Sequence, residues 1–254
     1  MEFCNQIGFR CDIIWEYREM LFNGALMTLK LTVIAIFAGT FIGLFNAFAR
    51  MAYAEKSNIV VRAALAVVRY ISLIYVTLFR GTPLFVQVFI WYFVWMPMLI
   101  HPDNGLIISG IQASEIRREY GAFLAGALAL SANAGAYITE IFRAGIQSIG
   151  KGQIEAARSL GLGYWQSMRY IILPQAVRRM LPPFGNEFIT LLKDSSLVSA
   201  ISVTELAFTA RTMSGTYARY EEPYYTIALI YLVMTICLAF FFSFLEKRYK
   251  VVAR

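Results

Sequence analysis

The stretch LTVIAIFAGTFIGLFNAFA, residues 31–49, contains no charged side chain. A helix needs about 20 predominantly apolar residues to cross the hydrocarbon core of a bilayer. The preceding turn, residues 24–30, adds length, and Lys30 can extend its ammonium group toward the membrane surface while its carbon chain stays among apolar groups. This stretch therefore predicts a transmembrane helix over residues 24–50.

The composition of the whole chain agrees with this prediction. Of the 254 residues, 59% are hydrophobic and 15% are charged, and the mean hydropathy is +0.58. Ordinary soluble domains contain roughly 45–50% apolar and about 25% charged residues. Disordered, collagen-like and coiled-coil chains are excluded. Three cysteines without a pairing pattern and a single histidine exclude a disulfide framework and a zinc cluster. The expected class is an all-α integral membrane protein.

Further apolar runs predict more membrane crossings. The run at residues 184–208 is interrupted by four charged residues, but charges at membrane depth usually face other protein or a water-filled cavity. We therefore keep it as a span that faces the interior. The five predicted spans are residues 24–50, 83–100, 120–146, 184–208 and 224–246.

The segment at residues 57–80 is apolar enough to resemble a span. However, Arg62 and Arg69 lie seven residues apart, which places them on one face of a helix. We predict a helix that lies along the cytoplasmic interface and leads into the next span. The alternative is a sixth crossing.

The distribution of basic residues predicts the orientation, because Lys and Arg accumulate in cytoplasmic loops. With five spans and residues 147–183 in the cytoplasm, 15 of the 23 Lys and Arg residues lie on the cytoplasmic side and six lie outside. We therefore predict the N-terminus outside and the C-terminus inside. Residues 1–23 then form an extracytoplasmic segment without the pattern of a signal peptide. The net charge of +7 reflects this topology, and no nucleic acid partner is expected.

The predicted cytoplasmic loop contains the sequence QIEAARSLGLG, residues 153–163. Residues 153–160 are mostly good helix formers, and Glu155 lies in the first turn, where the helix dipole favours an anion. Ala156 and Ala157 allow close approach of another protein, and Gly161 allows the chain to reverse sharply. We expect a short helix that fits a groove on a partner, with an ordinary surface loop as the alternative.

Prolines follow this helix. A second amphipathic helix is expected at about residues 164–173, before Pro174. Pro182 and Pro183 then remove two backbone N–H donors in succession. We therefore predict a break in the chain before the span at residues 184–208.

The spacing in this loop also matches a known signature. Glu155-Ala156-Ala157, Gly161, Ile171 and Leu173-Pro174 reproduce the EAA signature of ABC importer permeases. Further matching segments are RGTPL with Gln87 (residues 80–87), AY with EI and RAGI (136–146), LPQA (173–176), GNE (185–187) and LKDSS (192–196). Over about residues 24–250, the chain resembles the polar amino-acid permeases, the family of the histidine, glutamine and arginine importers.

The resemblance implies a type I ABC importer permease fold, with five transmembrane helices and a cytoplasmic coupling helix, in a bacterial inner membrane. It implies two cytoplasmic ATPase subunits that bind ATP and Mg, a second permease copy or homologue, and an extracytoplasmic binding protein that delivers a polar amino acid. In this family the EAA helix docks in a cleft of the ATPase. The residues that the resemblance assigns to this contact are Glu155, Ala156, Ala157, Ser159, Leu160 and Gly161.

The chain itself carries no site for ATP hydrolysis. It has no G-x-x-x-x-G-K-[ST] phosphate loop, and the sequence SIGKG at residues 148–152 lacks the first glycine and the hydroxyl. We therefore expect a transporter subunit that is not an enzyme and holds no cofactor. The alternative is an ion-coupled secondary carrier with a regulatory loop, although no internal repeat or pair of broken spans supports it.

Polar residues within the predicted spans are candidates for a substrate path, because an amino acid needs donors for its carboxylate and acceptors for its ammonium group. These candidates are Thr82, Gln87, Asn133, Lys193, Ser195 and Ser196. For each of them, packing between helices is the alternative role.

Charged residues near the span ends are candidates for a gate or an ion pair. They are Arg80, Glu140, Arg143, Glu187 and Asp194. Glu140 could pair with Arg80 or Arg143, whereas Lys193 and Asp194 point about 100° apart on a helix and are poor partners for each other. Whether Glu140 or Lys193 faces the path stays open, and so does the identity of the amino acid.

Overall fold

The computed structural model describes residues 10–51 and 58–249, and most of them are helical. Among these residues, the β structure is limited to one isolated bridge between Ile100 and Ile108. The predicted all-α class is therefore confirmed.

The helices follow one another along the chain with short connections. The first half contains α2 (Cys11–Glu16), α3 (Arg18–Met51), α4 (Ile59–Gly81), α5 (Leu84–Ile90), the π-helical segment η1 (Trp91–Trp95), α6 (Met96–Leu99) and α7 (Ile111–Gln147). The second half contains α8 (Lys151–Ser159), α9 (Tyr164–Ser167), the π-helical segment η2 (Met168–Ile172), α10 (Leu173–Asp194), the 3-10 segment η3 (Ser195–Ile201), α11 (Leu206–Tyr217) and α12 (Glu221–Tyr249).

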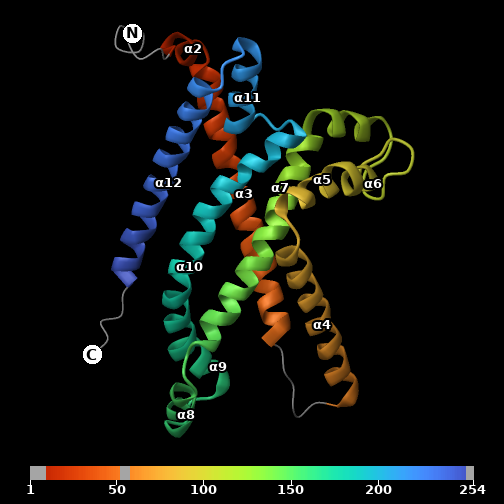
Figure 1. Cartoon of the computed structure of the whole chain (residues 1–254). Coiled ribbons are helices and arrows are strands. Elements are labelled where there is room, and N and C mark those ends of the chain that lie inside the picture. Colours follow the sequence, from red (N-terminus) through yellow and green to blue (C-terminus); the bar gives the residue numbers. More distant parts are fainter. Residues whose placement is uncertain (1–9, 52–57, 250–254) are drawn as a thin grey trace.

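Helix α7 forms the centre of the molecule (Figure 1). Helices α3 and α10 lie against it, while α4 and α12 lie on opposite flanks. Helices α8 and α9 lie at one end of the molecule, called here the inner end, and α2 and α11 lie at the other, called the outer end. Helices α3, α7 and α10 run along the molecule between these two ends.

A close and extensive contact joins α3 and α7. On α3, Gly39 and Gly43 have the small-xxx-small spacing that lets membrane helices approach each other. A Cβ atom at Gly39 would lie 2.9 Å from the Ala134 Cβ, and one at Gly43 would lie 2.7 Å from the Ile138 Cγ2. Larger side chains at the two glycines would therefore push these helices apart.

Within the described residues, four helices are long and apolar enough to cross a membrane, namely α3, α4, α7 and α12. The predicted spans at residues 24–50, 120–146 and 224–246 lie inside α3, α7 and α12. The predicted span at residues 83–100 corresponds to the shorter apolar stretch Leu84–Leu99, which comprises α5, η1 and α6.

Of the segment expected along the cytoplasmic interface, residues 57–80, all from Ile59 onward belongs to α4. Asn58 caps this helix, and residue 57 lies outside the described residues. Helix α4 rises from the inner end toward the middle of the molecule (Figure 1). Its first half is largely exposed, whereas in its second half Tyr75 donates a hydrogen bond to the Ala132 carbonyl on α7, at 2.6 Å. The length and hydropathy of α4 also suit a crossing, which was the alternative for this segment.

The predicted break at Pro182 and Pro183 is wrong, because α10 continues through both prolines. Both prolines are exposed, and so are Arg178 and Arg179, whose carbonyls lose their usual N–H partners. Water can bind such exposed carbonyls, so the missing donors do not end the helix. Residues 164–194 are therefore helical throughout, including Pro174 in the first turn of α10.

The predicted span at residues 184–208 is not a single helix. Helix α10 ends at Asp194, the chain continues as the 3-10 segment η3, and Ser202 then adopts a left-handed conformation with φ of 67°. Residues 206–208 already belong to α11 at the outer end. The long helix of this region, α10, thus begins and ends earlier in the sequence than the predicted span does.

The N-terminal segment packs at the outer end. Of the predicted extracytoplasmic residues 1–23, residues 1–9 lie outside the described part of the chain. In α2, Ile13 is fully buried in a cluster with Leu206, Met213 and Ile227, which belong to α11 and α12. The backbone N–H of Arg10 donates to the Glu222 carboxylate at 3.2 Å. Helix α2 therefore fastens the start of α3 to α11 and α12.

Candidate functional site

The predicted EAA helix is present as α8, and most of its side chains are exposed. Glu155, Ala156 and Ser159 are exposed on the helix, and Leu160, which follows it, is 80% exposed. Ala157 is an exception, because it is only 1% exposed and packs toward the rest of the inner end. One face of α8 is thus available to a partner, while the other is held by the chain.

Gly161 ends α8 in the way that its sequence predicts. Its φ of +79° lies in the left-handed region that favours glycine. The Leu162 N–H donates to the Ala157 carbonyl at 3.0 Å, and the Gly161 N–H donates to the Arg158 carbonyl at 2.9 Å. This is the Schellman pattern, which satisfies the last carbonyls of a helix and reverses the chain.

The base of α8 is attached to two long helices. Arg179 on α10 donates a hydrogen bond to the carbonyl of Ser148, just after α7, at 2.5 Å. An apolar cluster at the inner end contains Ile149, Ile172, Ala176 and Met180, with Ile154 of α8 packed against it. The connection from α7 to α8 and the start of α10 therefore form one packed unit.

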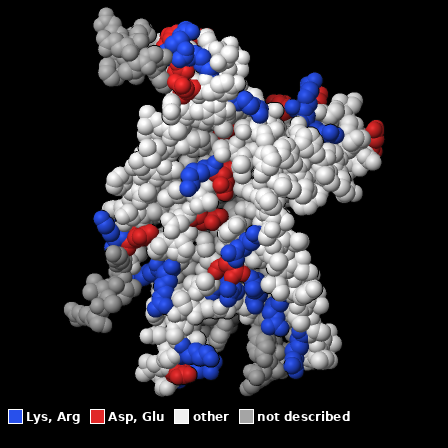
Figure 2. Space-filling model, viewed as in Figure 1, with Lys and Arg blue, Asp and Glu red and all other residues white. Residues whose placement is uncertain are grey.

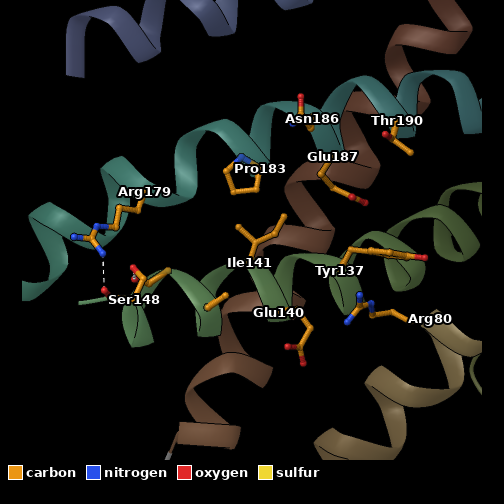
Figure 3. A pocket seen from close by; sticks show the side chains of 12 residues that line it. Arg80, Tyr137, Glu140, Ile141, Ser148, Arg179, Pro183, Asn186, Glu187 and Thr190 are labelled. Carbon is orange, nitrogen blue, oxygen red and sulfur yellow. Dashed lines mark hydrogen bonds between the residues drawn. The ribbon is translucent and has the colours of Figure 1, made fainter. Parts of the chain in front are cut away.

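A cavity of about 520 Å³ lies above this unit, between α7 and α10. The view in Figure 3 shows α10 contributing Pro183, Asn186, Glu187 and Thr190, α7 contributing Tyr137, Glu140 and Ile141, and α4 contributing Arg80. Figure 2 shows charged side chains in the middle of this face of the molecule, and further ones at its left edge, its lower right and its upper projections, with uncharged surface between them. The cavity is open, and charged side chains such as Arg80, Glu140 and Glu187 line it together with apolar ones.

In the α7 wall of the cavity, Glu140 forms ion pairs with two arginines. One carboxylate oxygen accepts from Arg50 at the end of α3, and the other accepts from Arg143 at 2.6 Å and 2.9 Å. The side chain of Glu140 is 19% exposed, so water screens these pairs only in part. The charge of Glu140 is thus compensated within the chain, and the pairs join α3 to α7.

Arg80 takes a different position from the one expected in a pair with Glu140. Its guanidinium carbon lies 5.0 Å from the centre of the Tyr137 ring, a cation–π contact between α4 and α7. No ion pair joins Arg80 to Glu140 or to Glu187. Arg80 therefore links the end of α4 to the cavity wall.

Glu187 and Asp194 are half-buried on α10, seven residues apart. Among the residues that the structure describes, neither side chain has a hydrogen bond or an ion pair within 4 Å. Lys193 is exposed, and Ser196 is half-buried. Ser195 is fully buried and donates to the Leu192 carbonyl at 2.7 Å. Of the candidates on this segment, Glu187 lines the cavity, and the others lie further toward the outer end.

Three candidates for the substrate path instead bond to one another. The Asn133 amide on α7 donates to the Gln87 side-chain oxygen at 3.1 Å, and the Gln87 amide donates to the Thr82 hydroxyl at 2.9 Å. Gln87 is 5% exposed and Asn133 is 6% exposed. Their polar groups are largely used within the chain, away from the cavity lining.

A comparison with protein families decides the kind of protein. The model of the family described as binding-protein-dependent transport system inner membrane component matches residues 59–251. The chain belongs to this family of inner membrane components. The match includes α8 and the helices that form the cavity.

Two curated relatives of this inner membrane component align over nearly their whole length. The protein named "Probable amino-acid ABC transporter permease protein YckA" of Bacillus subtilis is 39% identical over 95% of this chain and 94% of its own. The glutamine transport system permease protein GlnP of Escherichia coli is 36% identical over 96% of this chain and 99% of its own.

A solved structure has the same fold as this inner membrane component. It is titled as the crystal structure of an amino acid ABC transporter with histidines, and its matching chain is 38% identical. The TM-score is 0.76, and the match covers 92% of this chain and 96% of the other. The fold is therefore that of the membrane subunits of ABC importers.

The inner membrane component has site residues that the sequence interpretation missed. Arg50 pairs with Glu140, and Tyr137, Asn186 and Thr190 line the cavity. Tyr137, Glu140, Ile141 and Ala144 recur at helical spacing, and so do Pro183, Asn186, Glu187 and Thr190. This periodicity could have grouped the lining residues by face. No local sequence pattern indicates that Arg50 pairs with Glu140, which lies 90 positions away.

Proposed function

We propose that this chain is the membrane-spanning permease subunit of an ATP-driven importer for polar amino acids. The observation that carries the proposal is the exposed helix α8, whose base is fastened to α7 and α10. These two helices also wall the cavity. A displacement of α8 would therefore change the cavity, as the coupling of ATP hydrolysis to alternating access requires. The names of the relatives, which refer to amino-acid and glutamine transport, support this function.

In this proposal, α8 docks on a separate ATPase. Two ATPase subunits bind ATP and Mg, while this chain is not an enzyme and binds no cofactor of its own. The exposed residues Glu155, Ala156, Ser159, Leu160 and Gly161 make the contact. Ala157 supports the helix from within, because it is buried in its own chain. A second permease copy or homologue and an extracytoplasmic binding protein complete the complex.

The proposed substrate path follows the polar face of α10 from the cavity toward the outer end. Glu187, Lys193 and Asp194 are the candidates to meet the substrate, since their charged groups are not used in ion pairs among the described residues. The hydrogen bonds of Thr82, Gln87, Asn133 and Ser195 favour structural roles for these four residues. The Arg50–Glu140–Arg143 cluster lies in the α7 wall of the cavity, where we propose a gate.

The proposed topology has five crossings in a bacterial inner membrane, with the N-terminus outside and the C-terminus inside. Helices α3, α7, α10 and α12 make four of them, and α4 together with α5 and α6 makes the second crossing as a broken helix. The predominance of Lys and Arg on the cytoplasmic side supports this orientation. Cys11 is disulfide-bonded, which suits a compartment outside the cytoplasm.

Reconstitution tests the proposed function. The chain is placed in vesicles with its ATPase and binding protein, and the uptake of a panel of radiolabelled amino acids is measured with and without ATP. We expect ATP-dependent uptake of at least one polar amino acid. ATP-independent uptake by this chain alone, driven by a proton or sodium gradient, would instead support the ion-coupled carrier.

The coupling contact has its own variants. Gly161→Asp places a side chain where φ is left-handed, and Glu155→Lys reverses the charge on the exposed face of α8. We expect each variant to lose at least about tenfold in uptake, the factor that corresponds to about 1.4 kcal/mol. Gly152→Ala is the control, since this exposed glycine has no neighbour within 4 Å of an added Cβ and no positive φ. Normal ATP-driven uptake by both variants would exclude α8 as the coupling helix.

A further inference from the structure

The break between α4 and α5 is held by side chains rather than by the usual helical hydrogen bonds. Helix α4 ends at Gly81, and the next two residues are extended, with φ and ψ of −118° and 147° at Thr82 and −63° and 132° at Pro83. Helix α5 begins at Leu84. The chain therefore changes direction here, beside the central helix α7 (Figure 1).

Pro83 removes one hydrogen bond at this break. In a continuous helix, the carbonyl of Phe79 would accept from the N–H of residue 83, which proline lacks. The Phe79 carbonyl instead accepts from the side-chain amide of Gln87 at 2.8 Å and from that of Asn133 at 3.1 Å. Two amides thus replace the missing backbone donor, one from α5 and one from α7.

The other contacts at the break complete this arrangement. The Thr82 hydroxyl donates to the Leu78 carbonyl at 2.8 Å, and the Gln87 amide is also within 3.0 Å of the Thr82 carbonyl. The Asn133 amide additionally donates to the Gln87 side-chain oxygen. An amide has two hydrogens, so both donors of Asn133 are engaged at the break.

The clamp, defined as Gln87 and Asn133 on the Phe79 carbonyl, is next to a residue of the cavity. Arg80 follows Phe79 directly, and its guanidinium lies over the ring of Tyr137. Tyr137 is one helical turn from Asn133 on α7, so the two residues share a face. Asn133 therefore holds the backbone next to Arg80, while Tyr137 contacts the side chain of Arg80.

We infer that Gln87 and Asn133 are positioning residues for transport: the clamp fixes the bend between α4 and α5 on α7 and thereby sets the position of Arg80 at the cavity. They act through the backbone of Phe79 and do not contact the substrate. The inference rests on the proposed function, since transport is the process that the clamp serves. The bend itself belongs to this chain and can be measured without transport.

The first test measures the bend directly in the detergent-purified chain. Spin labels replace Ile71 on α4 and Phe93 in η1, which are 61% and 63% exposed, in a Cys237→Ala background that lacks the free exposed cysteine. Pulsed electron paramagnetic resonance then gives the distance distribution. We expect a narrow distribution with the clamp intact and a broader one in Asn133→Ala and Gln87→Glu. An unchanged distribution in both variants would overturn the inference.

A rescue variant separates the clamp from a general loss of packing. Pro83→Ala restores the N–H at position 83, which can donate to the Phe79 carbonyl. In the Asn133→Ala background, this second change should narrow the distribution again. Ser131→Ala is the matched control. Ser131 is buried on the same helix, but its hydroxyl donates to the Ala127 carbonyl within α7 and not to the break. If Ser131→Ala broadened the distance distribution as much as Asn133→Ala does, this result would count against the clamp.

Uptake kinetics provide the second test. Loss of the clamp should lower the maximal rate about tenfold while the KM stays within about twofold, because the substrate contacts remain. The matched control Ser131→Ala should transport normally. A raised KM with an unchanged maximal rate in Asn133→Ala would mean that Asn133 contacts the substrate, contrary to the inference. Absence of uptake in the unmodified complex would refute the proposed function, while the distance measurement would still decide on the clamp.

Discussion

Helices α7 and α12 are both long and apolar, but they occupy opposite environments. In the most apolar part of each helix, 72% of the residues of α7 are buried, against 11% in α12. The middle of α7 consists mainly of Gly, Ala and Ser, whereas α12 is rich in Phe, Leu, Ile and Tyr. Lipid is as apolar as these larger side chains, so close packing of small residues decides which helix becomes central. The size of the side chains, rather than hydropathy, distinguishes the two helices.

The largest expected effect comes from filling a close contact of α7. A Cβ atom at Gly135 would lie 2.7 Å from both the Ile42 Cγ2 and the Tyr75 hydroxyl oxygen. Gly135→Leu should therefore separate α7 from α3 and α4, at a cost above the roughly 1–3 kcal/mol typical of an overpacked core. We expect the detergent-purified variant to elute as aggregate in size-exclusion chromatography.

The control for this variant is Gly215→Leu on α11, where an added Cβ meets no atom within 4 Å. This variant should elute as the unmodified protein does. A monodisperse, thermally stable Gly135→Leu variant would show that the close packing of α7 is dispensable.

A smaller effect is expected where α12 does contact protein. Phe242 is 7% exposed, and its ring centre lies 5.6 Å from that of Phe188 on α10. Phe242→Ala should leave a cavity and lower the stability by about 2 kcal/mol, measured as a lower Tm in detergent. The adjacent Phe241, which is 55% exposed, is the control for alanine substitution. Equal Tm values for the two variants would mean that α12 has no specific contact here.

The ion pairs of α7 should contribute less. Glu140→Gln removes the charge shared by Arg50 and Arg143 but keeps one acceptor oxygen, so we expect a loss of about 1 kcal/mol. Because salt screens ion pairs, the difference in Tm from the unmodified protein should shrink at high ionic strength. Glu187→Gln, which breaks no ion pair among the described residues, should not show this salt dependence. A salt-independent loss in Glu140→Gln would point to packing instead.

The smallest effect is expected on the exposed face of α12. Phe240 is 74% exposed, and Phe240→Leu keeps an apolar side chain there. The stability should stay within about 0.5 kcal/mol of the unmodified protein, as for other exposed substitutions without specific contacts. Thermal unfolding in detergent measures this. A change as large as that of Phe242→Ala would indicate an unrecognised contact on this face.

The difference between local sequence and tertiary environment explains which parts of the fold could be predicted. Uninterrupted apolar runs identified α3, α7 and α12, and a short helix ending at glycine identified α8. The course of α10 was not predicted. Prolines and charged residues are unfavourable in an isolated helix in water or lipid, and the prediction treated this segment as isolated. Exposure of Arg178 and Arg179 next to the prolines lowers that cost and depends on the tertiary structure.

Within the site, local spacing identified residue types better than their partners. Gln87 and Asn133 were predicted as polar residues within the membrane. Their shared acceptor, the Phe79 carbonyl on α4, is evident only once α5 and α7 lie beside it. Glu140 was recognised as an ion-pair candidate, but its partner Arg50 comes from the end of a distant helix. A single sequence shows which polar and charged groups need a hydrogen-bond or ion-pair partner. It does not show which distant residue provides that partner.

The Schellman ending of α8 has a consequence for the speed of a transport cycle. Because Gly161 and Leu162 already close the helix, α8 needs no partner in order to adopt its shape. A segment that folded only on contact would lose conformational entropy at each docking event, at roughly 1–2 kcal/mol per ordered residue. In the proposed complex, a preformed helix avoids this loss, so that its contact with the ATPase can be weak enough to release quickly and still specific enough to form again in every turnover.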